Sequence, residues 1–150
     1  MKTISIGIMI VFLLSCSDQT PTYEPLSFEI RLAQPEVNSN LQEMQLYNSN
    51  LKFYVEDSVY LRNSDIKSTN VIDMTTQPKV FVNLTKEGAG KFANFTDRYI
   101  GRNAAILVGG KLVSAPRINA KIEEGKLIIV GYFTPEEAEK ISEGIITNNK

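Results

Sequence analysis

The amino-acid sequence predicts an α+β domain in which a largely antiparallel sheet of hairpins is covered by two main helices. Short apolar segments occur in pairs joined by turn residues, which is typical of hairpins. Two longer segments, residues 85–100 and 134–147, carry apolar residues at helical spacing. Because these helices lie between hairpins and do not follow every strand, the pattern favours antiparallel pairing.

The first third of the chain contains two predicted strands and a polar connection. Residues 27–32 alternate between apolar and polar, so we expect a strand with one buried face. Residues 34–50 are rich in Asn, Gln and Ser and predict a loop with room for a short helical turn. Residues 51–61 read as extended structure, with a break near Glu56.

The middle of the chain predicts a short helix and two strands. Asn63-Ser64-Asp65 can cap a helix over residues 64–69. A short strand follows at 71–75. After the turn at Gln77-Pro78, residues 79–84 place three apolar side chains on one face and predict another strand.

The helix over residues 85–100 has the strongest local signals. Thr85 is a good N-cap residue, and Gly101 suits the left-handed C-terminal stop. Its predicted core-facing stripe comprises Ala89, Phe92, Ala93, Phe95, Tyr99 and Ile100.

The last third predicts two hairpins and a closing helix. Residues 103–108 are apolar without alternation, which indicates a strand buried on both faces, and Gly109-Gly110 predicts a tight turn to a partner strand at 111–114. Residues 118–122 and 126–132 are predicted to pair around another turn. Thr134, Pro135 and Glu137 form a capping box; the apolar face of the helix that follows is Ala138, Ile141 and Ile145, and residues 148–150 should fray.

The composition excludes several classes of function. The chain has no His, so it lacks triads and imidazole metal sites, and its one Cys excludes an internal disulfide. With 16 basic and 17 acidic residues, a broad nucleic-acid-binding surface is not expected. Ser114 has no histidine partner, and the pairs Glu123-Glu124 and Glu136-Glu137 suit a turn and a helix start. We therefore expect no enzyme activity, no cofactor and no metal.

The N-terminus predicts a lipoprotein. Lys2 precedes an apolar run too short to span a bilayer comfortably, and the run ends in Leu13-Leu14-Ser15-Cys16, which resembles a bacterial lipobox. In that case residues 1–15 are a cleaved signal peptide and Cys16 is diacylated. Residues 16–26 would be the lipid anchor and flexible tether, 27–50 a strand with a polar loop, and 51–147 the main domain. The destination would be the periplasmic side of the inner or the outer membrane.

A series of short motifs in the second half resembles a known family. In order, they are Val82-Asn83-Leu84, Gly88-Ala89, Ala104 to Gly110, Val113-Ser114-Ala115-Pro116, Gly131, Phe133-Thr134 and Glu137-Ala138. This pattern is similar to the head subdomain of the first periplasmic domain of SecD, part of the SecDF protein-export complex.

The resemblance implies that this module handles exported polypeptide. We expect a membrane-anchored lipoprotein that binds exported or unfolded polypeptide, or an envelope or translocase protein, and that is not a proton-driven motor by itself. The alternative is a purely structural docking or scaffold lipoprotein. An extended peptide could pair with a strand edge at the expected binding residues Leu112, Val113, Ser114, Ala115, Pro116, Tyr132 and Phe133. Separately, Asp57-Ser58-Val59 resembles a bacterial O-glycosylation sequence.

Overall fold

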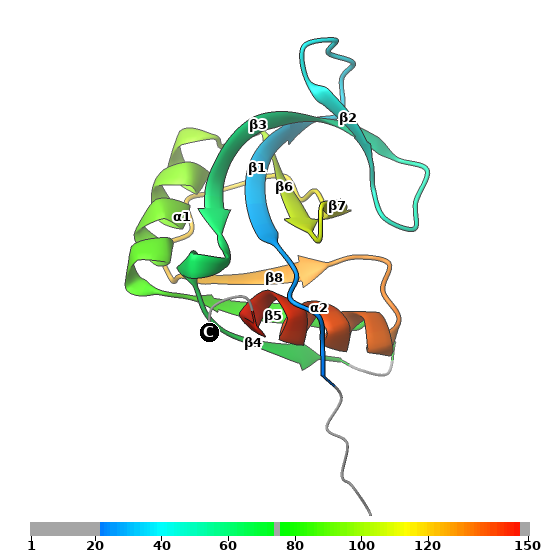
Figure 1. Cartoon of the computed structure of the whole chain (residues 1–150). Coiled ribbons are helices and arrows are strands. Elements are labelled where there is room, and N and C mark those ends of the chain that lie inside the picture. The colour runs from blue at the N-terminus through cyan, green and yellow to red at the C-terminus, as the bar shows by residue number, and fades with distance from the viewer. Residues whose placement is uncertain (1–21, 74–75, 148–150) are drawn as a thin grey trace, which may run out of the picture.

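The computed structural model describes residues 22–73 and 76–147 (Figure 1). The predicted signal peptide, Cys16, most of the tether and residues 148–150 lie outside the described residues. The elements are β1 Phe28–Gln34, β2 Gln42–Gln45, β3 Lys52–Arg62, a 3-10 turn Asn63–Asp65, β4 Ile66–Ile72, β5 Lys79–Leu84, α1 Lys86–Arg98, β6 Asn103–Val108, β7 Lys111–Ser114, β8 Lys126–Val130 and α2 Pro135–Thr147.

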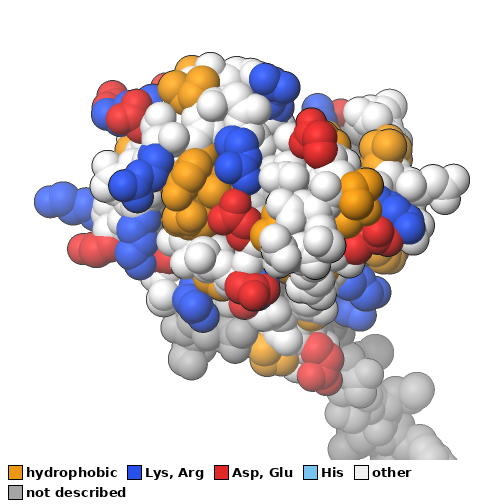
Figure 2. All heavy atoms as spheres, turned by 90° about the horizontal axis from the view of Figure 1, so that it is seen from above, with side chains coloured by type: hydrophobic (Ala, Val, Ile, Leu, Met, Phe, Trp, Pro, Cys, Tyr) orange, Lys and Arg blue, Asp and Glu red, His pale blue; other side chains and the backbone are white. Residues whose placement is uncertain are grey.

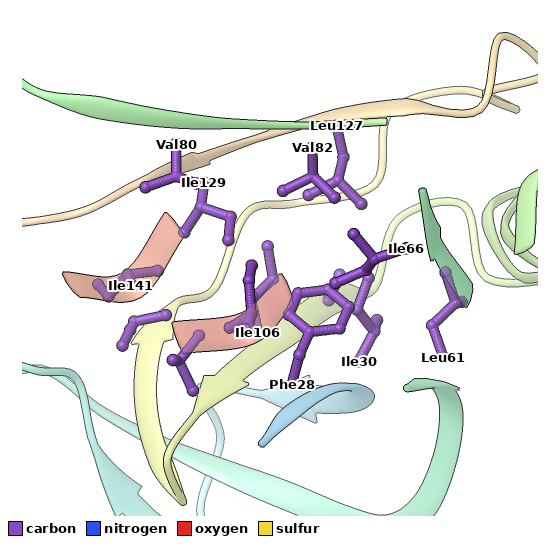
Figure 3. Packing of buried hydrophobic residues seen from close by; sticks show 14 of the residues in the cluster. Phe28, Ile30, Leu61, Ile66, Val80, Val82, Ile106, Leu127, Ile129 and Ile141 are labelled. Carbon is purple, nitrogen blue, oxygen red and sulfur yellow. The ribbon is translucent and has the colours of Figure 1, made fainter. Parts of the chain in front are cut away.

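Two antiparallel sheets with two longer helices confirm the predicted α+β class. The large sheet has the strand order β2-β3-β1-β6-β7, and the small sheet has the order β4-β5-β8. The sheets face each other across the main core: Val82 and Leu127 of the small sheet point toward Phe28 and Ile30 of the large one (Figure 3). Ala138, Ile141 and Ile145 of α2 pack into the same core, as predicted.

Both faces of the large sheet bury apolar side chains, because the sheet curls over its own outer face. Ala105 and Leu107 of β6 join Leu112 in a second cluster on the far side from the main core. The end of β2 reaches the opposite edge strand, where the backbone N–H of Tyr47 donates to the carbonyl of Leu112 at 2.8 Å. This burial confirms the prediction for residues 103–108.

Local signals at turns and caps are also confirmed. Gly109 and Gly110 have φ of 57° and 76°, the conformation that a tight primed turn requires. The Thr85 hydroxyl accepts from the Gly88 N–H at 3.0 Å. At α2, Thr134 and Glu137 exchange both hydrogen bonds of the capping box.

The predicted helix over 64–69 is wrong. The chain makes one 3-10 turn at Asn63–Asp65 and then enters β4, which pairs with β5 from Ile66 onward. The Asp65 carboxylate accepts from the Arg62 N–H at 2.9 Å and from the Lys91 ammonium at 2.6 Å. Asp65 therefore ends a turn and is tied to a distant helix, so it does not start a helix of its own.

Three other expectations need correction. Residues 34–50 contain β2, which pairs with β3, so the segment is not all loop. Residues 118–122 form no strand, and β8 pairs with β5. Ile100 is 55% exposed because α1 ends at Arg98 and the chain turns at Gly101, whose φ is 89°.

The expected break near Glu56 is present as a shift in the pairing of β3 with β1: Arg31 faces Val59, while Ala33 faces Val55.

Helix α1 is docked at its first turn by a glycine. A side-chain carbon added at Gly88 would lie 2.4 Å from the carbonyl oxygen of Asp65, and the Thr85 N–H donates to that same oxygen at 2.8 Å. At Gly90, one half-turn later, an added carbon would meet no atom within 4 Å. The approach of α1 to the 3-10 turn therefore requires glycine at one of these positions only.

We expect Gly88→Ala and Gly90→Ala to change stability in opposite directions. Gly88→Ala should lower the free energy of unfolding by about 1–3 kcal/mol because the new methyl overlaps Asp65. Gly90→Ala should raise it by about 0.5–1 kcal/mol because Ala is the better helix former. Denaturant unfolding of both variants measures this, and equal effects would contradict the packing argument.

The contact between Tyr47 and Glu137 should make stability depend on acid pH. The Tyr47 hydroxyl donates to Glu137 at 2.6 Å and, with the Thr134 N–H, holds the pKa of Glu137 below its usual value of 4.5. The stabilisation is therefore present at neutral pH and is lost as the pH falls through the lowered pKa. Glu137→Gln should flatten this acid decline in thermal unfolding, whereas Glu136→Gln, at an exposed neighbour, should leave it unchanged.

Candidate functional site

Most of the sequence-predicted binding residues are core residues. Leu112 and Val113 of β7 are 1% and 3% exposed, and Phe133 is buried in the main core. Ser114 is buried too, and its hydroxyl donates to the Val130 carbonyl at 2.7 Å, which joins the two sheets. Val113, Ser114 and Phe133 therefore help to join the two sheets, Leu112 packs in the second cluster, and all four side chains are buried.

The other predicted residues lie at or near the surface, in different surroundings. Ala115 is half-buried and Pro116 is exposed, directly after β7. Tyr132 is 59% exposed, and its carbonyl accepts from the Asn48 amide at 3.0 Å. Pro116 lines an apolar groove, whereas Tyr132 does not.

The groove at Pro116 lies between α1 and the irregular segment that follows β7. It holds about 300 Å³ and is lined almost entirely by apolar surface. We call it the Pro116 groove, and its lining residues are Phe92, Thr96, Ala104, Pro116, Arg117, Ile118, Asn119, Ala120 and Ile122.

Backbone hydrogen bonds fix the irregular wall of this groove. The Ala104 N–H donates to the Pro116 carbonyl at 2.9 Å, and the Ile118 N–H donates to the Arg102 carbonyl at 2.8 Å. At the far end the Ile122 N–H donates to the Thr96 hydroxyl at 2.9 Å. The wall is thus attached to the start of β6 and to α1 without forming a strand.

The chemistry of the groove suits binding. The irregular wall of the groove contributes two polar side chains, Arg117 and Asn119, and both are exposed. The volume of the groove is sufficient for one or two apolar side chains of a bound segment. Among the described residues, no three Asp, Glu, Cys or His side chains gather as a metal site would require. Tyr60 lies beside α1 and is not part of the groove. Burial, and to a smaller extent the 2.9 Å hydrogen bond with Tyr99, raise the pKa of Tyr60 to about 12, so its hydroxyl is neutral at ordinary pH.

Sequence reasoning missed the helix side of the groove. Phe92 is buried in the core as predicted, and it lines the groove as well; Thr96 also lines the groove, a role that the sequence did not predict. Their i, i+4 spacing on α1 puts them on one face, which is the signal that could have found them. Ile118 and Ile122 were predicted as strand residues, so their place in a wall was not foreseen.

The comparisons with known proteins identify the family. The model of the SecDF P1 head subdomain matches residues 36–145. The chain belongs to this family. The predicted resemblance to the SecD head is thereby confirmed for the domain.

Curated relatives are SecD subunits of the protein translocase. The chain is 40% identical over 83 residues to the protein translocase subunit SecD of Dictyoglomus turgidum and 36% identical over 89 residues to that of Acidaminococcus fermentans. These alignments cover 55% and 59% of this chain but 21% of each relative, so the chain spans about a fifth of their length.

Solved SecDF structures share the fold. A structure of SecDF, described as a membrane component that enhances protein export, aligns with a TM-score of 0.64 at 23% identity, covering 83% of this chain and 63% of that one. SecDF in its super-membrane-facing form aligns with a TM-score of 0.62, over 81% of this chain and 18% of that one. In the part of the chain that the structure describes, no helix has the length and apolar character needed to cross a membrane.

We expect Thr96→Val to loosen the groove wall. The Thr96 hydroxyl donates to the Phe92 carbonyl at 2.9 Å and accepts from Ile122, so Val leaves the Ile122 N–H without its acceptor. Faster hydrogen exchange at Ile122 and a loss of about 1 kcal/mol in unfolding free energy should follow. Thr96→Ser keeps the hydroxyl and should retain slow exchange; fast exchange in both variants would assign the effect to the lost methyl.

Proposed function

We propose that this protein is a lipid-anchored, periplasm-facing accessory of protein export whose Pro116 groove holds apolar segments of exported polypeptide. The observation that carries the proposal is an apolar groove on a SecDF P1 head domain whose curated relatives are translocase subunits. The proposal assigns binding to this chain and assigns it neither catalysis nor proton-driven movement.

The groove has features that suit a changing set of apolar segments. Its wall is irregular backbone held by hydrogen bonds, and its floor is formed by side chains of α1 and β6. Arg117 and Asn119 at the exposed wall can hydrogen-bond to the main chain of a bound segment. An apolar floor with polar donors beside it is a common arrangement for binding sites.

Anchoring by Cys16 is the second part of the proposal. It would keep the domain at the membrane where exported chains emerge, and two or three acyl chains hold a protein there more firmly than one. Mass spectrometry of the protein extracted from membranes should find acyl chains on Cys16. Cys16→Ala should remove these acyl chains, so the processed, lipid-anchored form of the protein should no longer be found in membranes. An unmodified Cys16 in the wild-type protein would contradict the anchor.

Site-specific crosslinking tests the groove. A photo-reactive residue in place of Ala120, which is exposed in the groove, should capture an exported polypeptide during its passage. The same residue in place of Glu139, which is exposed on α2 outside the groove, is the matched control and should capture little. Ile122→Asp should reduce capture at position 120 by about tenfold because it puts a charge at the apolar rim.

The same crosslinking experiment distinguishes polypeptide binding from the alternative docking or scaffold role. Capture of a single folded envelope protein at position 120, with no exported polypeptide, would support the docking or scaffold role. Equal capture at positions 120 and 139 would show that the groove has no special part.

A further inference from the structure

Among the described residues, no helix or strand packs on the outer face of the small sheet, and this face combines apolar side chains with polar ones. Cross-strand pairing puts Ile72, Lys79 and Val130 in one row and Asn70, Phe81 and Ile128 in the next. A third row contains Ser68, Asn83 and Lys126. These residues are the open face, since α2 packs on the other side of the sheet against Val80 and Ile129.

Large apolar side chains on this face are in contact with solvent. Ile128 is 45% exposed and Val130 is 47% exposed, whereas Leu127 and Ile129 beside them are buried in the core. The Pro116 groove includes no residue of the open face. An exposed apolar patch of this kind usually marks a contact surface.

The charges of the open face are all positive. Lys79 and Lys126 stand in its outer rows, and the remaining positions are neutral. The opposite side of the molecule differs: hydrophobic side chains there lie in small groups among residues of both signs (Figure 2). Ion pairs such as Lys52–Glu43 belong to the large sheet. Apolar side chains flanked by lysines complement a surface that is apolar inside and anionic outside.

The path of the chain places the predicted anchor near the β4 edge of the small sheet, beside α2. Tyr23 lies in a hollow between β4 and α2, which is lined by Asn70 and Val71 on one side and by Glu139 and Glu143 on the other. The Leu26 N–H donates to the Gly144 carbonyl of α2 at 2.9 Å. The described chain thus begins at the edge of the small sheet, at the lower end of Figure 1. Between Cys16 and Thr22 the chain can span at most about 20 Å. A lipid on Cys16 would therefore keep this end of the domain close to the bilayer.

We propose that the open face rests on the membrane as a second contact, with Lys79 and Lys126 on the phosphates of anionic lipid headgroups and with Phe81, Ile128 and Val130 among the acyl chains at the interface. This inference rests on the lipid attachment proposed above. The contact orients the domain, so that the small sheet faces the bilayer and the large sheet faces away. It is reversible, because each lysine near an anionic surface contributes only about fivefold to binding.

The test uses the lipidated full chain in vesicles. Acylation consumes the only thiol of the natural chain, so a cysteine introduced by Asn70→Cys on the open face can carry a single spin label. Asn40→Cys, in the exposed loop before β2 at the opposite end of the molecule, is the matched control. Accessibility of each label to oxygen and to a water-soluble nickel complex reports its immersion.

In vesicles of equal parts phosphatidylglycerol and phosphatidylcholine, the label at 70 should be immersed and the label at 40 aqueous. Lys79→Gln with Lys126→Gln should lower the ratio of docked to undocked protein by about thirtyfold. Phosphatidylcholine vesicles should show the same loss without any substitution.

The possible failures are distinguishable. Protein that does not float with the vesicles lacks the anchor, which overturns the proposed anchoring and this inference together. Protein that floats while the label at 70 stays aqueous overturns this inference and leaves the anchor intact. Immersion of the label at 70 that changes neither with headgroup charge nor with the lysine substitutions would also overturn this inference. So would protection of position 70 that is seen only when unfolded polypeptide is added.

Discussion

One buried carboxylate holds the corner on which both sheets and α1 depend. Asp65 is 3% exposed, and a buried charge is tolerated only when it is paired and hydrogen-bonded. Its oxygens accept from the Arg62 N–H at the end of β3 and from Lys91 of α1, while its carbonyl accepts from Thr85. At this residue the chain passes from β3 of the large sheet to β4 of the small sheet, and its carbonyl binds Thr85, the N-cap of α1. Asp65 therefore adds a polar tie between β3, β4 and α1 to the apolar core that the two sheets share.

What the sequence predicts well is whatever local chemistry decides. The turn at Gly109-Gly110 needs positive φ, the capping box at Thr134 needs only four neighbouring residues, and the apolar run in β6 can only be buried. What it predicts poorly depends on distant partners. Ser68 to Val71 became β4 because β5 lies beside them, and residues 118–122 became a wall because Thr96 and Arg102 supply their hydrogen bonds.

The candidate site follows the same division. Pro116 was predicted as a binding residue and lines the groove. Leu112 and Val113 are buried, because β7 lies between two apolar clusters and contributes one of these side chains to each. The exposed residues Ile128 and Val130 belong to an apolar run that suggests burial on both faces. Only the sheet order, with no described helix or strand packed on the outer side of β8, shows that one face is open. A groove for polypeptide and an open face toward lipid would then occupy separate surfaces of one domain.

The hydrogen bond from Tyr47 to Leu112 has a consequence for the order of folding. It joins edge strands that are far apart in the sequence, and it can form only after β3, β1 and β6 are already paired. Long loops close slowly, so we expect this seam to form last and to open first when the native protein fluctuates. The curl of the large sheet is thus the part of the fold that the chain completes late, after most of its length is available.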